Sequence, residues 1–515
     1  MTTSDATRPK LPMRMLLGSL QVIERVGNKL PHPFWLFTIM AGLVILLSAG
    51  LNALGVSAES PDGERIEVRS LLSPEGMQAI FGDAVENFAS FPPLAIIIVV
   101  MLGVSVAEQS GMLNALLRGS VTRVPAKWLT FAVALTGVTA SVASDAAYVV
   151  LIPLGALLFK AAGRSPILGL VLAFTSVSAG YNASLLITPT DALLSALTTE
   201  AAGIVDADYT VTALDNYFFT FLSAIFLAAL ITLVTEYVLS RRTDSLVEDH
   251  DNEDDTHQLG SMALTATERR GMRNAGLVVL VFIAVFAAAL APSASPLRGE
   301  AGTVLESPVI TGIAYLLGIL FLLVGIVYGR TVGSLTRARD VPEAMAVGVR
   351  DLAPVIVLFF AASQFLAYFD WTGIGEVVAI RGAGFLDAAG VHPVVLFLGM
   401  ILFATLMNIL ITSGSAQWAL IAPIFVPMFM LLSVPPETTQ AIYRIADSST
   451  NVISPMSPYF VMALGFLQRY RKDAGIGTLI SLTLPISITV LVGWTLFFLG
   501  WWALGIPLGP GADVR

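Results

Sequence analysis

The sequence lacks cysteine altogether, has four histidines among 515 residues, and has few charged residues, 13% of the chain. The absence of cysteine excludes disulfides and thiolate metal sites. The histidines are scattered, and neither an HExxH motif nor a Walker A glycine loop occurs, so nothing indicates a zinc hydrolase or ATP-driven transport. A soluble domain typically has about 25% charged residues, well above the fraction here. We therefore expect a membrane protein that is not an enzyme, binds no cofactor and binds no nucleic acid.

Hydrophobic residues make up 56% of the chain, in many runs near the ~20 residues that cross a bilayer as a helix. Basic residues flank spans on the cytoplasmic side, and the stretch before residue 33 carries Arg8, Lys10, Arg14, Arg25 and Lys29. We expect an all-α polytopic protein of the bacterial inner membrane with a cytoplasmic N-terminus and no cleavable signal. The nine predicted full spans are 33–55, 91–109, 166–199, 216–239, 274–292, 308–328, 350–370, 441–466 and 476–505.

Two further apolar runs, 129–159 and 392–432, are too long for one crossing, and the first is also too short for two crossings with a turn. The first has basic residues on both flanks, Lys127 on one side and Lys160 and Arg164 on the other. Both have small and polar residues at their centres, where a lipid-facing helix would be apolar. A re-entrant helical hairpin satisfies these features. The positive-inside pattern predicts that the first enters from the cytoplasm and the second from outside.

The chain also shows signs of an internal repeat. Three pairs of residues align at nearly constant offsets of 270 or 269, namely Pro153 with Pro423, Asn182 with Asn451, and Pro189 with Pro458. We predict two inverted halves, 1–240 and 308–505, each with one hairpin and one broken helix (166–199 and 441–466). A cytoplasmic charged linker, 241–273, which includes the acidic run EDHDNEDD, and a linking helix, 274–292, join the halves.

Non-helical backbone at membrane depth survives only where it is buried in protein or lines a cavity, so the hairpin tips and broken helices predict a shared interior site. Their hydroxyl, amide and carbonyl oxygens suit Na⁺, although small polar residues also permit close helix packing. We predict one Na⁺ site at the first tip and a counterpart at the second. The predicted ligands are Ser141, Ser144, Asp145, Gly180 and Asn182 for the first site, and Ser413, Ser415 and Asn451 for the second.

Ionisable residues inside spans are expensive and usually functional. Arg444 and Asp447 lie three residues apart, on one helix face. They could neutralise each other, or Arg444 could receive a substrate carboxylate while Asp447 binds a coupling cation or proton. If coupling uses protons instead of Na⁺, Asp191 or Asp447 would carry them.

Trp418 comes shortly after the second predicted hairpin tip. A tryptophan there is either an anchor at the membrane interface or a stacking wall for an aromatic substrate. We favour the wall, because Trp418 aligns with Tyr148 in the repeat. The N-termini of the broken helices offer positive dipole ends to an anionic substrate.

Four stretches resemble the AbgT family of p-aminobenzoyl-glutamate transporters: SVASDAAYVVLIPLGA (141–156), AGYNASLLITPTDALL (179–194), ITSGSAQWALIAPIFVPM (411–428) and YRIADSSTNVISPMSPYF (443–460). The resemblance extends over nearly the whole chain. It implies a homodimer with a bowl-like architecture related to divalent-anion/sodium symporters. It implies p-aminobenzoyl-glutamate-like substrates and, in some members, export of sulfonamide antimetabolites. It also implies important roles for Asp191, Asn408, Trp418, Arg444 and Asp447.

Residues and resemblance together predict a secondary transporter of aromatic carboxylates, coupled to Na⁺ or H⁺. Its partners would be the small-molecule substrate, membrane lipid and a second copy of the chain. Two alternatives stay open, a Na⁺-coupled carboxylate importer of the divalent-anion symporter type and a channel. The predicted substrate-binding residues are Asp191, Asn408, Ser415, Trp418 and Arg444, and the predicted coupling residues are Asp447 and the ligands of the two Na⁺ sites.

Overall fold

The computed structural model describes residues 32–515 except 60–62, 64, 122–123, 144–145, 244–262, 300–301 and 305–306. Ser144, Asp145, the basic N-terminal stretch and most of the predicted linker therefore lie outside the described residues. The described chain is helical apart from connecting segments and one small antiparallel sheet, in which β1 (Ser57–Glu59) pairs with β2 (Arg65–Glu67).

Nine helical segments of the described chain are long and apolar enough to cross a membrane. Several are composite, since α4 continues into α5, 3-10 turns flank α7, and a π-helical turn, η3, follows α11. Their bounds are α2 Pro33–Ala53, α4 Ala84–Ala89, α5 Pro92–Gln109, η1 Ala126–Trp128, α7 Leu129–Thr139, η2 Ala140–Ala143, α11 Tyr217–Val234, η3 Thr235–Leu239, α14 Ala266–Leu290, α16 Ile313–Val332, α18 Ala353–Trp371, α20 Pro393–Leu410 and α24 Ile476–Leu504. The prediction of a multi-pass all-α membrane protein with nine long apolar helices is confirmed.

The nine long helices are not the same nine that the sequence predicts. Seven coincide with predicted spans, while the other two are the first helices of the predicted hairpins, Ala126–Ala143 and Pro393–Leu410. Each of the two predicted broken helices is a pair of shorter helices, neither of which is long enough to count among the nine. The predicted boundary at residue 274 also differs, because α14 begins at Ala266, where Thr265 and Glu268 form a capping box.

The helix breaks occur where the chain supplies glycine, asparagine, serine and proline. In the first half α9 (Pro166–Ala179) ends before residues 180–188, and α10 (Pro189–Ala202) comes next. In the second half α22 (Pro436–Asn451) ends before residues 452–457, and α23 (Pro458–Tyr470) comes next. Pro189 and Pro458 each stand at the first helical position, where the missing N–H is not needed and the fixed φ suits the helix. Proline thus restarts a helix after both breaks.

Each predicted hairpin is likewise two helices separated by a short segment. In the first, η2 ends at Ala143 and α8 (Ala146–Ala161) is the second helix; in the second, α20 ends at Leu410 and α21 (Gly414–Met430) is the second helix. The second helix of each pair contains an internal proline, Pro153 in α8 and Pro423 in α21. The re-entrant path of these pairs and the inverted relation of the halves stay predictions.

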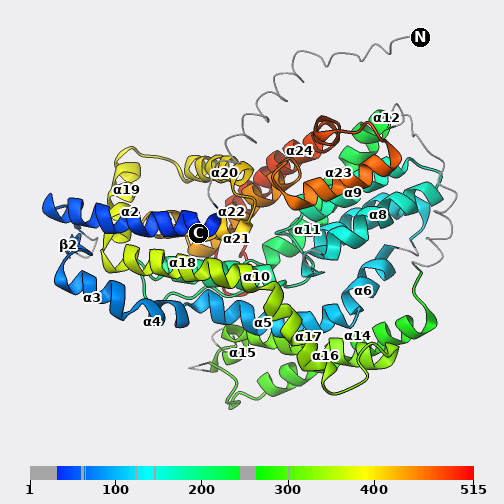
Figure 1. Cartoon of the computed structure of the whole chain (residues 1–515), viewed down its shortest axis with the longest axis horizontal. Helices are drawn as coiled ribbons and strands as arrows, with labels where there is room; N and C mark the ends of the chain where they lie inside the picture. The colour runs from blue at the N-terminus through cyan, green and yellow to red at the C-terminus, as the bar shows by residue number, and fades with distance from the viewer. Residues whose placement is uncertain are drawn as a thin grey trace, which may run out of the picture.

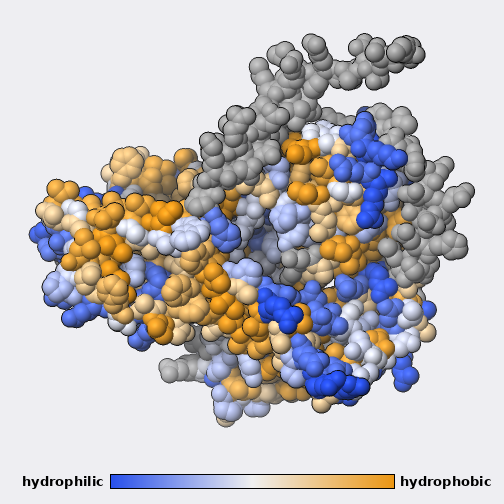
Figure 2. Space-filling view, in the orientation of Figure 1, coloured by the Kyte–Doolittle hydropathy of each residue, from blue (hydrophilic) through white to orange (hydrophobic). Residues whose placement is uncertain are grey.

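The central helices of the molecule are α10, α21 and α22, with α2, α18 and α19 towards one end and α8, α9 and α23 towards the other (Figure 1). Along the lower side in that view lie α5, α14 and α16. Hydrophobic side chains cover much of the end that holds α2 and α18 (Figure 2), as expected of a surface in contact with lipid or a second chain. The remaining helices are α3 Pro74–Gly82, α6 Met112–Val121, α12 Ser240–Thr243, α15 Pro308–Thr311, α17 Asp340–Asp351 and α19 Ile374–Ala388.

Close packing of α5 on α16 illustrates how helices associate without a hydrophobic driving force. A Cβ added at Gly103 of α5 would collide with the carbonyl oxygen of Gly318 on α16. Glycine at this crossing lets the two backbones approach closely, as in many membrane helix pairs. By contrast, α22 is buried along nearly its whole length, from Pro436 to Thr450, although its sequence is polar. A buried polar helix needs partners for its side chains, and these partners define the candidate site.

Candidate functional site: a cavity at the helix breaks

Polar side chains form a row along one face of α22. Glu437, Gln440, Arg444, Asp447 and Asn451 follow one another at spacings of three or four residues, which places them on one side of the helix. All except Asn451 are at least nine-tenths buried. Buried polar and charged groups are costly unless they are hydrogen-bonded or paired. The neighbouring helices must therefore supply specific partners along this face.

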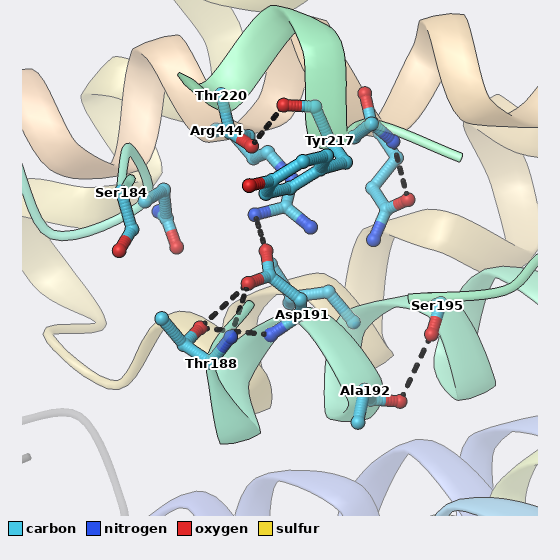
Figure 3. A network of polar contacts seen from close by, with 12 residues as sticks. Ser184, Thr188, Asp191, Ala192, Ser195, Tyr217, Thr220 and Arg444 are labelled. Atoms are coloured by element: carbon cyan, nitrogen blue, oxygen red, sulfur yellow. Dashed lines mark hydrogen bonds and ion pairs between the residues drawn. The ribbon is translucent and has the colours of Figure 1, made fainter. Parts of the chain in front are cut away.

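Arg444 forms a buried ion pair with Asp191 of α10, with 2.6 Å between Nη1 and Oδ1. Asp191 is also the third residue of α10, where its Oδ2 accepts hydrogen bonds from the backbone N–H of Thr188 at 2.7 Å and from the Thr188 hydroxyl at 2.8 Å. Figure 3 shows the Arg444 guanidinium directed at this carboxylate, beside the ring of Tyr217. The carboxylate of Asp191 thus has two roles: it caps the N-terminus of α10, and it neutralises the charge of Arg444. The alternative that Arg444 forms its ion pair with Asp447 is wrong, because its partner is Asp191.

Asp447 connects the first break to the second hairpin region. Its Oδ2 accepts a hydrogen bond from Nδ2 of Asn182 at 2.6 Å, and the backbone N–H of Asn182 donates to the hydroxyl of Ser448 at 3.0 Å. The carboxylate also lies against the start of α21, since a Cβ added at Gly414 would be 3.0 Å from both of its oxygens. The N-terminus of a helix favours a negative charge at such a position. A Cβ at position 414 would crowd the carboxylate, and glycine there avoids this contact.

Asn408 of α20 anchors the end of α22. Its Nδ2 lies 2.7 Å from the Asp447 carbonyl oxygen, 2.9 Å from Oγ1 of Thr450 and 3.0 Å from Oδ1 of Asn451. An amide has two N–H groups, so it donates to two of these acceptors at a time. The residues alone had not singled out Asn408, which entered through the family resemblance. The available signal was a lone amide within an otherwise apolar span.

Trp418 is fully buried between helices. Its Nε1 donates to Oγ1 of Thr198 on α10 at 3.0 Å, and its ring stacks on Tyr443 of α22 with centroids 4.5 Å apart. An anchor at the membrane interface would expose its ring to the headgroup region, so that alternative is wrong. The predicted stacking wall has no support from this position, since Trp418 does not line the cavity at the helix breaks.

This cavity, of about 390 Å³, lies where the breaks and the second hairpin region meet. Its size suits a small organic ligand. Five predicted site residues line it, namely Asn182, Ser413, Ser415, Asp447 and Asn451. Tyr148, Tyr181, Thr190, Ser457 and Tyr459 also line it and were not predicted as site residues. The signal that could have identified Tyr459 and Ser457 was their position at the start of the helix after the second break.

The predicted ligands of the second cation site all line the cavity, whereas of the first set only Asn182 does so among the described residues. Ser413, Ser415 and Asn451 all line the cavity, and the hydroxyl oxygens of Ser413 and Ser415 lie 3.5 Å apart. In the first set Asn182 faces Asp447, while Gly180 packs so closely on Val138 that an added Cβ would lie 2.6 Å from Val138 Cγ2. Among the described residues no group of three or more His, Cys, Asp or Glu is arranged to hold a metal ion.

Ser141 of the first set is buried, and its hydroxyl makes no hydrogen bond within the described part of the chain. Its predicted companions Ser144 and Asp145 lie outside the described residues. The assignment of this first Na⁺ site stays a prediction.

Comparisons with known proteins agree along nearly the whole chain. Residues 18–515 match the family described as the AbgT putative transporter family. The p-aminobenzoyl-glutamate transport protein of Escherichia coli K12 is 39% identical over 495 residues, which cover 96% of each chain. The YdaH transporter of Alcanivorax borkumensis is 42% identical, with a TM-score of 0.87 over 93% of this chain and 100% of that one. MtrF of Neisseria gonorrhoeae, whose structure is described as illuminating a class of antimetabolite efflux pumps, is 41% identical, with a TM-score of 0.90 over 96% of this chain and 99% of that one.

Proposed function

Because the chain belongs to the AbgT family of transporters, we propose that it moves p-aminobenzoyl-glutamate-like aromatic carboxylates, and sulfonamide antimetabolites, across the bacterial inner membrane by coupling to Na⁺ or H⁺. The observation that carries the proposal is the cavity at the helix breaks, which Asn182 and Asp447 help to line, together with two buried polar contacts. Asn182 with Asp447, and Asp191 with Arg444, each join the first half of the chain to the second.

These contacts provide a physical basis for coupled transport. A transporter of this kind opens its site to one side of the membrane at a time by moving one part of the protein against another. Movement of the halves would change these two contacts, and the strength of each contact depends on protonation or on a bound cation. Occupancy by an ion would therefore bias the conformational equilibrium. A channel requires only a continuous pore and has no need of charge pairs that link the halves.

Two groups at the cavity suit a coupling ion. Asp447 is a carboxylate at the cavity wall and can take up a proton or contribute a charge to a cation site. The hydroxyls of Ser413 and Ser415 and the amide of Asn451 are hard oxygen ligands of the kind that Na⁺ prefers, and they lie around the same cavity. The two mechanisms differ in whether a Na⁺ gradient alone drives flux.

Arg444 can receive a substrate carboxylate, as predicted, only if its surroundings change. Its guanidinium is already held by Asp191 and does not line the cavity. A substrate carboxylate would have to displace Asp191 or add to the Nε side of the guanidinium, where no described residue accepts a hydrogen bond. We propose that such an exchange belongs to a different conformation of the transport cycle.

We also propose that the chain forms a homodimer with its N-terminus in the cytoplasm. The apolar side chains of α2, such as Trp35 at 58% exposure and Leu46 at 66%, support contact with lipid or with a second copy. Chemical crosslinking in native membranes would test the dimer.

The direct test is flux of p-aminobenzoyl-glutamate into proteoliposomes that contain the purified full-length protein. Under an imposed Na⁺ or H⁺ gradient we expect concentrative uptake, which stops when an ionophore collapses the gradient. Uptake that only equilibrates would indicate a channel. Flux no greater than in protein-free liposomes would refute the proposed function. Asp447→Asn serves as the coupling variant, and we expect it to bind substrate but not to concentrate it.

A further inference from the structure

The row of polar side chains on α22 extends away from the cavity, to the end of the helix that the predicted topology places outside. Glu437, in the first turn, is 6% exposed, and its Oε2 accepts a hydrogen bond from the Tyr209 hydroxyl at 2.9 Å. Neither residue has a role in the function proposed above. The charged groups that act on this pair are three acids, Asp206, Asp215 and Asp513. A buried carboxyl among like charges takes up a proton more readily than one in water.

Two buried amides lie along the row between Glu437 and the ion pair of Arg444 with Asp191. Asn216, just before α11, donates from Nδ2 to Oε1 of Gln440 at 2.9 Å, and both side chains are at most 2% exposed. Oδ1 of Asn216 and Nε2 of Gln440 form no hydrogen bond within the described part of the chain, and neither does Nε of Arg444. Buried polar groups almost always have a partner, and ordered water supplies it where the protein does not.

The spacing along α22 makes the row continuous. Glu437, Gln440 and Arg444 follow one another at intervals of three and four residues, so each is a neighbour of the next on the helix surface. The row therefore joins a carboxyl at the outer end of α22 to the Arg444–Asp191 ion pair about two turns further along. Water at the unpaired amide atoms would complete a chain of hydrogen bonds, and such chains with carboxyl groups at their ends are typical of proton relays in membranes.

These observations point to a proton path. Resting on the function proposed above, we propose that Glu437 is the proton-uptake group of the transporter, and that water held by Asn216 and Gln440 carries the proton from it to Asp191. The proton leaves the outside solution, passes through the Glu437 carboxyl and ends on the Asp191 carboxylate. Arg444 keeps its own proton throughout, because a guanidinium is not deprotonated in proteins.

Arrival of the proton changes the surroundings of Arg444. A neutral Asp191 no longer balances the charge of the guanidinium, which is 2.6 Å away. An uncompensated buried charge is costly, so the guanidinium then favours another carboxylate, and the substrate has one to offer. Proton uptake at Glu437 is thereby linked to release of Arg444 for the substrate. A proton moves along hydrogen bonds by exchanging them, which Na⁺ cannot do, so the path commits coupling to H⁺.

Two assays on the full-length protein in proteoliposomes separate proton uptake from substrate movement. The first is concentrative uptake of p-aminobenzoyl-glutamate driven by a pH gradient. The second is exchange of labelled for unlabelled p-aminobenzoyl-glutamate at equal concentrations, which needs no net transfer of protons. Glu437→Gln removes the titratable group and should lose concentrative uptake while it keeps exchange. Glu437→Asp keeps a carboxyl and should restore concentrative uptake.

Further variants follow the path. Gln440→Leu replaces the amide by an apolar side chain of similar size, and should lose concentrative uptake but not exchange. Tyr209→Phe removes the hydrogen bond to the Glu437 carboxylate, which favours the protonated form. Uptake by this variant should therefore persist to a higher outside pH than in wild type. Asp208→Asn removes an exposed acid from the same segment as Tyr209 and is the matched control, without effect in either assay.

The outcomes separate this inference from the proposed function. If Glu437→Gln concentrates substrate like wild type, the proton path is refuted while the proposed function stands. Loss of both assays in a folded Glu437→Gln would refute it too, because the residue would then be needed for substrate movement itself. If Glu437→Gln does not fold, the pH profile of Tyr209→Phe decides, and an unshifted profile refutes the path. Wild-type uptake driven by a Na⁺ gradient but not by a pH gradient refutes the path and leaves the proposed function intact. If the wild type neither concentrates nor exchanges the substrate, both fail.

Discussion

Removing the negative charge of Asp191 should lower the free energy of unfolding, because it leaves the buried Arg444 guanidinium without its partner. In Asp191→Asn the Arg444 guanidinium loses its 2.6 Å partner, although both side chains are almost fully buried, at 2% and 9% exposure. An uncompensated charge left behind in a buried pair typically costs about 3–5 kcal/mol of folding free energy. The amide oxygen of asparagine can still accept the hydrogen bonds from Thr188, so the start of α10 should survive. The expected loss therefore reports on the charge pair and not on the helix cap.

The second half of the experiment is to remove the partner as well. In Asp191→Asn with Arg444→Met no buried charge remains, and we expect much of the lost stability to return, because replacing both members of a buried pair is often close to neutral. The free energy of unfolding would be measured by denaturant titration of each variant in detergent micelles. The matched control is Glu343→Gln, which removes a partner from the exposed pair of Arg339 and Glu343, 3.9 Å apart. We expect no measurable change there.

One result would refute the reasoning. If Asp191→Asn loses less than about 1 kcal/mol, and the double variant is no more stable than Asp191→Asn alone, the buried pair contributes little and the guanidinium is compensated elsewhere. Transport measured on the same variants then separates stability from function. A double variant that is stable but does not transport would show that the pair is needed for the transport cycle and not only for folding.

Other contacts give three further predictions. Gly414→Ala should abolish most transport while the protein still inserts, because the new Cβ would lie 3.0 Å from both carboxylate oxygens of Asp447. Flux that matches wild type would show that the carboxylate is free to move aside. Trp418→Ala should lower the free energy of unfolding by about 3–5 kcal/mol, because the tryptophan ring fills a buried site. Trp418→Phe keeps an aromatic ring there and should cost clearly less. Equal losses in the two variants would indicate that the indole N–H contact with Thr198 dominates. Single cysteines in place of Lys127 and Ala162 should label from the cytoplasmic side only, which is testable because the chain has no cysteine; labelling from opposite sides would contradict the re-entrant hairpin.

The sequence by itself determined the class of the protein and the places where its helices break. Long apolar runs with few charges require a helical membrane protein, because only helices satisfy their own backbone in lipid without closing a barrel. Proline and small polar residues mark the restarts at Pro189 and Pro458, since these effects are local to the chain. The residues that surround the cavity, such as Asn182 and Asp447, stood out because a polar group within a span is costly.

The tertiary structure decided which of these residues face one another. Arg444 has a candidate partner three residues away in Asp447, yet its ion pair is with Asp191, 253 residues distant. Trp418 turns towards Thr198 and Tyr443 instead of the cavity, whereas Tyr148 and Tyr459 line the cavity and stack on each other. Local spacing fixes the face of a helix on which a side chain lies, but not the helix packed against that face. The partners of a buried charge are set by the packing of several helices at once, so they could not be read from spacing along the chain.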